Sequence, residues 1–337
     1  MPKRDVDDVR LLNLGPTAAW RTQAVYHATA ELMTADTPDT IILCQPLTPY
    51  LCLGYHQDCD SVLDREECER RALQVVRRRV GGGLTYLDAN QLFYQCVFHH
   101  ARVPVKFEDV YARMLAAPVK TLHRLGLSAD LVEVNEIEVQ GLRIAGVGGG
   151  RIGEACVVVG NILFDFDYAA MTAVWNAPWA SFRELASAAL RERITTLWRH
   201  AGPVTIEAVQ WILLEEFEKA LGRKIVRGKP TREETRRARA LAKLIGSERF
   251  LQRHSDNGVG RAMRSLKISA GVFICAAETE INAERVRASF RVDDGLIAAA
   301  RLDSESRGGW EKQERELVGM EIEQWRSLLR VPARATV

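Results

Sequence analysis

The sequence of 337 residues lacks the marks of a secreted, membrane-spanning or disulfide-rich protein. No apolar run approaches the roughly 18 residues of a membrane-spanning segment. The charged start MPKRDVDDVR is followed by no apolar core of a signal peptide. The seven cysteines are scattered and odd in number, and no C-x-x-C pair occurs. We therefore expect a cytoplasmic protein with reduced thiols, and neither a disulfide framework nor a zinc site.

The sequence also lacks a strong excess of either charge. It has 46 basic and 44 acidic residues, for a net charge of +2, so neither nucleic-acid nor membrane binding is expected. A basic run on a helix expected at residues 231–245 is interpreted as a solvated face, with a nucleic-acid patch as the weaker alternative. Internal repeats and low-complexity tracts are absent. The length favours two domains.

Three consecutive glycines, at positions 81–83, follow three arginines at positions 77–79, with Val80 between them. Three glycines in a row are not expected inside a packed strand or helix, and they allow backbone amides to approach a ligand closely. Residues rich in β-formers lie on both sides, which predicts a strand, a cationic turn and a second strand. Such a turn suits a phosphate or carboxylate. The alternative is a tight hairpin with a solvated basic rim.

Hydrophobic periodicity predicts an α+β fold, in which a mixed sheet with packed helices precedes a small α+β unit. The domains are expected at residues 1–246 and 260–337. A two-residue turn is expected at Gln140 and Gly141, and a capping box at Thr231 and Glu234. Strands are expected at 9–14, 41–44, 50–53, 132–139, 142–147, 155–166, 266–276, 286–292 and 296–302. Helices are expected at 18–33, 64–72, 107–125, 182–189, 205–221, 231–245 and 310–329, and a further one begins near Tyr168.

The arginine–glycine segment, residues 77–88, resembles the R-R-x-S-G-G-G-x-V-Y-H-D signature of the lipoate–protein ligases, in the biotin/lipoate protein ligase superfamily. Val80 stands where the family has serine, and Leu87 where it has histidine. The positions that match are Arg77, Arg78, Gly81, Gly82, Gly83, Tyr86 and Asp88.

A second segment, residues 135–146, is similar to the family's N-D-…-G-x-K-I-[SA]-G hairpin. Asn135 and Glu136 fall on the Asn and Asp, and Arg143 stands where the family has its essential lysine. The resemblance implies that this residue contacts the acyl carbonyl and the phosphate of an acyl-adenylate. An arginine keeps the positive charge and can donate two parallel hydrogen bonds to a pair of oxygens. Because it is bulkier than an ammonium, we expect retained ligand binding and weaker oxyanion stabilisation.

Further segments extend the resemblance along the chain. Residues 160–167 are similar to the family's H-G-T-L-L-x-N-x-D strand, with Val159 and Asn161 at the His and Thr. Residues 50–58 look like the segment that lines the acyl tunnel, and the C-terminal unit is similar to the accessory domain that assists adenylation. The pair His99–His100 has no carboxylate or third ligand at useful spacing, so no metal site is expected there.

The resemblance implies the following site residues, with no direct protein site for a metal because magnesium arrives with the nucleotide. Arg143 is the catalytic residue; Arg78, Gly81, Gly82, Gly83, Leu84 and Asn161 bind the acyl-adenylate or phosphate; Asn135 and Glu136 lie on the nucleotide and magnesium side; Gly54, His56, Val80, Leu87, Ala145 and Gly146 line the acyl tunnel.

The implied function is activation of lipoate or octanoate by ATP and Mg²⁺, then transfer of the acyl group to a lysine of a lipoyl carrier, either a GcvH-like protein or a lipoyl domain. Two alternatives stay open. One is an acyl transferase between carriers, for which Cys156 is the only plausible nucleophile, since the related octanoyltransferases place their cysteine where residues 127–130 or 175–178 have none. The other is a non-catalytic lipoyl- or carrier-binding protein.

Overall fold

The computed structural model describes residues 7–254, 263–281, 284–304 and 309–326. The chain forms two compact units. The first comprises residues 1–59, 65–167 and 194–254, and the second comprises 60–64, 168–193 and 255–337. Residues 168–193, which were expected in the first domain, belong to the second unit. Helix α6 (Ala180–Arg193) in this segment packs on the sheet formed by strands between residues 264 and 304. No helix among the described residues is long and apolar enough to cross a membrane.

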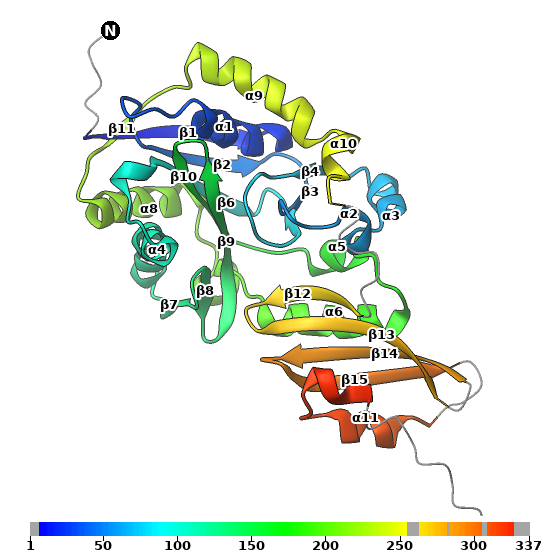
Figure 1. The fold of residues 1–337 in the computed structure, drawn as a ribbon. Helices are drawn as coiled ribbons and strands as arrows, with labels where there is room; N and C mark the ends of the chain where they lie inside the picture. The colour runs from blue at the N-terminus through cyan, green and yellow to red at the C-terminus, as the bar shows by residue number, and fades with distance from the viewer. Residues whose placement is uncertain (1–6, 255–262, 282–283, 305–308, 327–337) are drawn as a thin grey trace, which may run out of the picture. The chain divides into compact units, whose positions relative to one another are not determined.

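The first unit is built on an eight-stranded mixed sheet, as Figure 1 shows. The strand order is β11-β1-β2-β6-β10-β9-β8-β7, parallel from β11 to β2 and antiparallel beyond. This confirms the α+β class with a mixed sheet. The strands are β1 (Val9–Thr17), β2 (Thr40–Pro46), β6 (Gln91–His99), β7 (Ala129–Val132), β8 (Glu136–Val139), β9 (Leu142–Ile152), β10 (Ala155–Leu163) and β11 (Ile225–Arg227).

Helices cover both faces of this sheet. Helix α1 (Ala19–Glu31) packs against α9 (Arg232–Ile245), and α4 (Phe107–Arg124) packs against α8 (Ile206–Leu221) (Figure 1). Because successive side chains of a strand point to opposite faces, Leu11 joins the core cluster under α4 and α8, whereas Leu12 joins the cluster under α1 and α9. Short helices complete the unit: α3 (Arg65–Arg70), α7 (Leu197–Ala201), α10 (Glu248–Leu251) and the 3₁₀ helix η1 (His100–Arg102). Helix α2 (Cys59–Val62) begins where the first segment of the unit ends.

A three-stranded sheet carries the arginine–glycine segment. It consists of β3 (Tyr50–Leu53), β4 (Gln74–Arg77) and β5 (Thr85–Leu87) in the order β4-β3-β5. The predicted strands on either side of the glycine turn are confirmed. The tight-hairpin alternative is wrong, because β4 and β5 both pair with β3 rather than with each other.

Two sequence-based expectations for the large sheet are wrong in detail. The single strand expected at 132–139 is a hairpin of β7 and β8, because the chain turns at Glu133, where φ is +51°. Gly148, Gly149 and Gly150 lie inside β9, paired with β10, so a glycine triplet does occur within a packed strand. The turn at Gln140 and Gly141 is confirmed, with φ of +54° and +74°. The capping box of Thr231 and Glu234 is also confirmed.

The second unit holds a four-stranded antiparallel sheet of β12 (Arg264–Ser269), β13 (Val272–Ile281), β14 (Glu284–Asp293) and β15 (Leu296–Ser304). The strand expected at 266–276 is broken by a turn at Gly271, where φ is +66°. Ser181 of α6 contacts Ser289 and Asp303 of the sheet. The single helix expected at 310–329 is interrupted after residue 317, helical structure resumes at 322–326, and 327–329 lie outside the described residues. The helices are α5 (Tyr168–Ala173), α6 (Ala180–Arg193), α11 (Glu311–Leu317) and η3 (Ile322–Gln324).

Candidate active site

The two glycine triplets meet backbone to backbone. The amide of Gly81 donates a hydrogen bond to the carbonyl of Gly149, 3.2 Å away. A Cβ atom at Gly148 would lie 2.7 Å from the oxygen of Gly81, and one at Gly149 would lie 2.9 Å from the oxygen of Val157. The arginine–glycine loop therefore lies directly on strand β9, and glycine is required on that strand because a side chain would separate the two segments.

A second close approach fixes the loop from β3. A Cβ atom at Gly54 would lie 1.8 Å from the oxygen of Gly82, and Gly82 itself has φ of +101°. Gly83 differs, since nothing lies within 4 Å of its added Cβ. Gly54 and Gly82 are thus required by the loop geometry itself, whereas Gly83 faces open space that a ligand can share.

The three arginines of the loop are structural anchors in this conformation. Arg77 is fully buried and donates to main-chain carbonyls of Gly54 and Phe250, among others, and burial lowers the pKa of its guanidinium. Arg78 is 7% exposed and donates to the carbonyls of Gly81, Cys52 and Gly83 at 3.0, 3.1 and 2.8 Å. The solvated basic rim is therefore wrong for these two residues, while contact of Arg78 with a phosphate stays a prediction.

Helix α1 holds the third arginine. The amide of Arg79 donates to Nε2 of His27, 3.0 Å away, and its guanidinium pairs with Glu31. Burial, followed by the charge of Arg79, lowers the pKa of His27 to about 3, so this imidazole is neutral and can accept the amide hydrogen. His27 is a loop-positioning contact that sequence reasoning missed, because no local pattern connects residues 52 positions apart.

Arg143 differs from the loop arginines in having an unused donor. Its Nη1 atom lies 3.6 Å from Oε1 of Glu136, whose side chain is 6% exposed. Its Nε atom is buried with no hydrogen-bond partner. A β-bulge at Ile144 shifts the register between β8 and β9, and this places Arg143 diagonally across from Glu136. The structure thus brings together the two residues expected at the acyl–phosphate junction and the nucleotide side.

Asn161 connects β9 to the start of β6. Its Oδ1 accepts from the amide of Gly146 at 3.2 Å, and its Nδ2 donates to Oε1 of Gln91 at 2.7 Å. Asn135 donates to the carbonyl of Val147 at 3.2 Å. The expected phosphate- and nucleotide-side residues therefore cluster along β9, although none of these contacts tests what they bind.

The expected tunnel residues are distributed over two faces of the large sheet. Val80 and Leu87 belong to the core cluster under α1 and α9, whereas Ala145 belongs to the cluster under α4 and α8. Leu84 is 9% exposed at the end of the glycine loop. His56 is exposed, with its ring 5.8 Å from that of His254. Their role in holding an acyl chain stays a prediction.

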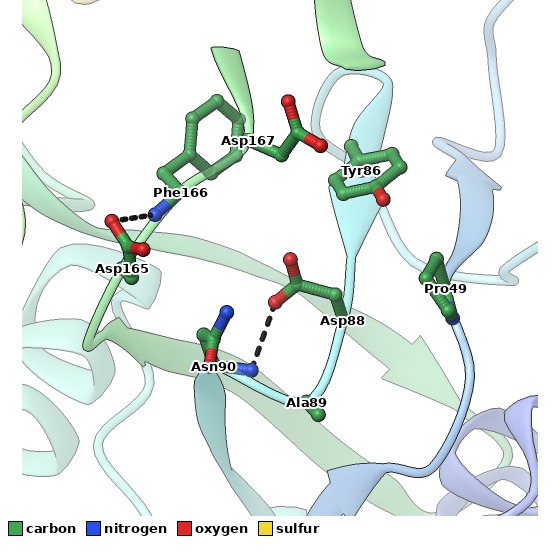
Figure 2. Close-up of a pocket in the computed structure, with 8 residues that line it drawn as sticks. All are labelled: Pro49, Tyr86, Asp88, Ala89, Asn90, Asp165, Phe166 and Asp167. Atoms are coloured by element: carbon green, nitrogen blue, oxygen red, sulfur yellow. Dashed lines mark hydrogen bonds between the residues drawn. The ribbon is translucent and has the colours of Figure 1, made fainter. Parts of the chain in front are cut away.

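A pocket of about 550 Å³ is lined by the segment around the end of β5 and by the residues that follow β10 (Figure 2). Three carboxylates, of Asp88, Asp165 and Asp167, line it together with Tyr86. Burial, with a contribution from the two other aspartates, raises the pKa of Asp88, and burial and Asp88 raise the pKa of Tyr86 to about 12. Because the pocket carries three carboxylates, it disfavours an anionic ligand.

The cysteines are inert in this conformation. All seven are buried and outside any disulfide bond. Burial raises the pKa of Cys156 to about 11, which disfavours the thiolate that a nucleophile requires. Cys156 also lies five residues from Asn161 along β10, about 17 Å at the rise of a strand. It is therefore distant from Asn161, the residue expected at the acyl-phosphate group.

The tertiary structure corrects one premise of the prediction for His99 and His100. Their dismissal as metal ligands rested on the lack of a nearby carboxylate. Glu154, which is distant in sequence, lies against both rings, with its Oε2 2.8 Å from Nε2 of His100.

The protein class follows from the fold and this site. The family model for the lipoyl protein ligase A/B catalytic domain matches residues 16–218, and the chain belongs to that family. It is an enzyme of the lipoate–protein ligase type.

The proteins similar to this chain include both octanoyltransferases and lipoate–protein ligases. The octanoyltransferase LipM of Kyrpidia tusciae is 27% identical over 266 residues, which is 71% of this chain and 97% of that protein. The fold resembles a bipartite lipoate–protein ligase of Thermoplasma acidophilum, described with its E2 lipoyl domain (TM-score 0.68, 22% identity, 73% of this chain and 97% of the other). It also resembles a lipoate–protein ligase A bound with ATP (TM-score 0.63, 22% identity, 73% and 99%).

Proposed function

We propose that this enzyme uses ATP and Mg²⁺ to activate lipoate or octanoate as an acyl-adenylate, and then transfers the acyl group to a lysine of a lipoyl carrier in the cytoplasm. The observation that carries the proposal is the state of Arg143. Among the described residues its buried Nε donor has no partner and its guanidinium has a loose ion pair, at 3.6 Å, whereas Arg77 and Arg78 donate to main-chain carbonyls. Arg143 thus offers a donor to an anionic acyl-phosphate group.

The chemistry of adenylation needs positioning and charge stabilisation rather than a protein nucleophile. A carboxylate oxygen of the fatty acid attacks the α-phosphorus of ATP, and pyrophosphate leaves. The lysine amine of the carrier then attacks the acyl carbonyl, loses a proton, and AMP leaves. Arg143 would contact the bridging acyl-phosphate oxygens through both steps. The open backbone at Gly83 and the amides of the glycine loop would lie along the phosphate.

The residues of the β8–β9 hairpin fit a nucleotide with its magnesium ion. Glu136 supplies a carboxylate, the ligand type that Mg²⁺ prefers, and Asn135 supplies an amide beside it. Magnesium would neutralise the phosphates that Arg143 alone does not. The carrier would be a lipoyl domain, by analogy with the domain named for the Thermoplasma ligase, or a GcvH-like protein.

The decisive experiment is intact-mass spectrometry of a lipoyl domain incubated with this enzyme and lipoate or octanoate, with and without ATP and Mg²⁺. We expect an acyl mass gain on the carrier that requires ATP. Arg143→Gln should remove it, while Arg236→Gln, at an exposed arginine of α9 that pairs only with Glu233 among the described contacts, should not. Absence of any mass gain with active carriers of both kinds would contradict the proposal.

The transferase alternative is supported by the match over 97% of the octanoyltransferase LipM. It requires a thioester on a cysteine, and the buried, weakly acidic thiol of Cys156 argues against that. Octanoyl carrier protein without ATP should therefore leave no acyl adduct on the enzyme. An adduct that disappears in Cys156→Ser would establish the transferase instead.

A further inference from the structure

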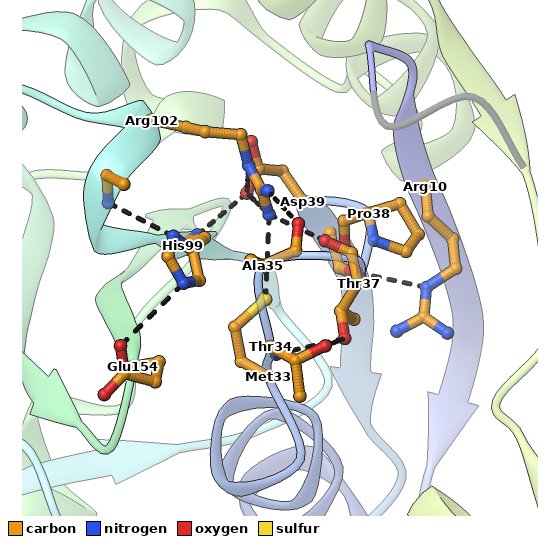
Figure 3. Close-up of polar contacts among 12 residues, drawn as sticks. Arg10, Met33, Thr34, Ala35, Thr37, Pro38, Asp39, His99, Arg102 and Glu154 are labelled. Carbon is orange, nitrogen blue, oxygen red and sulfur yellow. Dashed lines mark hydrogen bonds and ion pairs between the residues drawn. The ribbon is translucent and has the colours of Figure 1, made fainter.

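A cluster of two histidines and a glutamate lies at the end of the large sheet remote from Arg143. His99 is the last residue of β6, His100 opens η1, and Glu154 occupies the turn between β9 and β10. Their candidate ligand atoms all lie within 4.8 Å of one another. Figure 3 shows the side chains of His99 and Glu154 directed toward each other.

The separations within this cluster suit a common metal ion. Oε2 of Glu154 lies 2.8 Å from Nε2 of His100 and 3.9 Å from Nε2 of His99. Two ligands bound tetrahedrally to zinc at 2.0–2.1 Å are about 3.3 Å apart, between these two values. Both distances from the Glu154 carboxylate differ from that value by about 0.6 Å or less, so we expect side-chain rotations to bring the ligand atoms onto a common ion.

The backbone around the cluster is held by other contacts. The amide of His100 donates to the carbonyl of Glu154 at 2.9 Å, and the amide of His99 donates to Oδ1 of Asp39 at 2.8 Å. Asp39 in turn pairs with Arg102 and Arg223. The rings of His99 and His100 stack with centroids 4.7 Å apart. Ligand positions are thus set by the fold before any ion binds, which lowers the ordering cost of binding.

We infer that His99, His100 and Glu154 bind a zinc-class divalent ion. Two imidazoles and one carboxylate are a ligand set for Zn²⁺ and for Co²⁺ as its spectroscopic substitute, whereas Mg²⁺ prefers oxygen ligands alone. The side chains of His99, His100 and Glu154 are 9%, 39% and 56% exposed, so the fourth coordination position faces solvent and takes water.

Binding requires one change of tautomer. Nδ1 of His99 accepts a hydrogen bond from the amide of Ala101 at 3.2 Å, so the neutral ring carries its proton on Nε2. With the metal on Nε2, the proton resides on Nδ1, so the hydrogen bond from the Ala101 amide is lost and that amide donates to water instead. Ala101 is exposed, so its amide has water within reach. His99 keeps one proton throughout, and no co-reactant is needed.

The site is independent of the acyl-transfer chemistry. In the pairing of β6 with β10, His99 lies opposite Ala155 and Phe93 lies opposite Asn161. Six residues of strand, or about 20 Å, separate these positions. The ion would bridge the end of β6 to the β9–β10 turn, and its role would be structural, because the acyl site lies beyond its direct contact.

The test uses the full-length protein, first stripped of metal with a chelator. Calorimetric titration with Zn²⁺ should show one equivalent bound, and Co²⁺ should give visible d–d absorption of a site with nitrogen and oxygen ligands. His100→Asn and Glu154→Gln should each weaken Zn²⁺ binding at least about tenfold. His99→Asn should do the same while retaining a side-chain acceptor for the Ala101 amide.

Matched histidines control for binding elsewhere. His123→Asn, at an exposed histidine of α4, and His56→Asn, at the His56–His254 pair, should both leave the titration unchanged. Circular dichroism confirms that each variant is folded. Lack of stoichiometric Zn²⁺ binding by the folded wild type, or binding that survives in both His100→Asn and Glu154→Gln, would overturn the assignment.

Discussion

Nη1 of Arg143 lies 3.6 Å from Oε1 of Glu136 across the β8–β9 hairpin, and Nε of the same guanidinium is buried without a partner. The pair balances the buried charge of Glu136 with the half-buried charge of Arg143, yet leaves one donor of the guanidinium unused. An anionic ligand that reaches Arg143 gains a charge-assisted hydrogen bond without breaking an existing one at Nε. Under the proposed function, this unused donor would let Arg143 bind the acyl-phosphate group at the position where the family has lysine.

The first prediction concerns that guanidinium. Arg143→Gln should lower kcat/KM for ATP-dependent carrier acylation by about 100-fold, the usual effect of removing a donor from developing charge. The kcat/KM of Arg143→Lys should lie between those of Arg143→Gln and the wild type. The ammonium keeps the positive charge but cannot donate two parallel hydrogen bonds as a guanidinium does. Steady-state assays with a lipoyl domain measure this, and Arg236→Gln is the matched control. An increase in Arg143→Lys would mean that the wild-type enzyme is impaired at the chemical step.

The second prediction concerns Gly54 and Gly83, two glycines whose surroundings differ. Gly54→Ala places a Cβ atom 1.8 Å from the oxygen of Gly82 and should displace the arginine–glycine loop, at a cost of roughly 1–3 kcal/mol in stability. Gly83→Ala meets nothing within 4 Å and should fold as the wild type does. Urea unfolding of both variants tests this. Equal midpoints for the two would show that the loop does not depend on the close approach.

The third prediction concerns the pH dependence of stability through His27. Burial lowers its pKa to about 3 in the folded protein, whereas an unfolded histidine titrates near 6.5. The unfolded state therefore binds one more proton between these values, and stability falls as the pH drops below about 6.5, by at most ~1.4 kcal/mol per pH unit.

His27→Gln isolates this effect, because glutamine retains an acceptor for the Arg79 amide but does not titrate. Unfolding free energies measured at pH 7, 6 and 5 should converge for the wild type and the variant as the pH falls. Parallel pH profiles would show that His27 is not the titrating group.

The fourth prediction concerns Arg77. Its guanidinium donates to the carbonyls of Gly54, Tyr55, Gln57, Phe250 and Leu251, which Arg77→Met would leave buried without that donor. We expect a loss of at least about 3 kcal/mol, since each unsatisfied buried group costs about 1–3 kcal/mol. Arg236→Met, whose side chain is 79% exposed, should change the stability by less than about 1 kcal/mol. Chemical denaturation followed by fluorescence compares them, and similar midpoints would argue against an anchoring role.

Much of the fold was predictable because its signals are local. The hairpin turn at Gln140–Gly141 follows from Gly141, which tolerates positive φ, and the start of α9 follows from the capping box of Thr231 and Glu234. The hairpin between β7 and β8 was not predicted, because Glu133 adopts positive φ at the turn and no glycine there indicates a turn in the sequence.

By itself, the sequence of this protein determined its family, its mixed sheet and the residues aligned along the glycine loop and the β8–β9 hairpin, because motif spacing and periodicity are properties of neighbouring residues. Only the tertiary structure decided what those residues touch. It turned the arginines at 77 and 78 into anchors for backbone carbonyls, left Arg143 with a free donor, and brought Glu154 to His99 and His100. Such contacts join residues far apart in the chain, and strand pairing rather than local preference sets them.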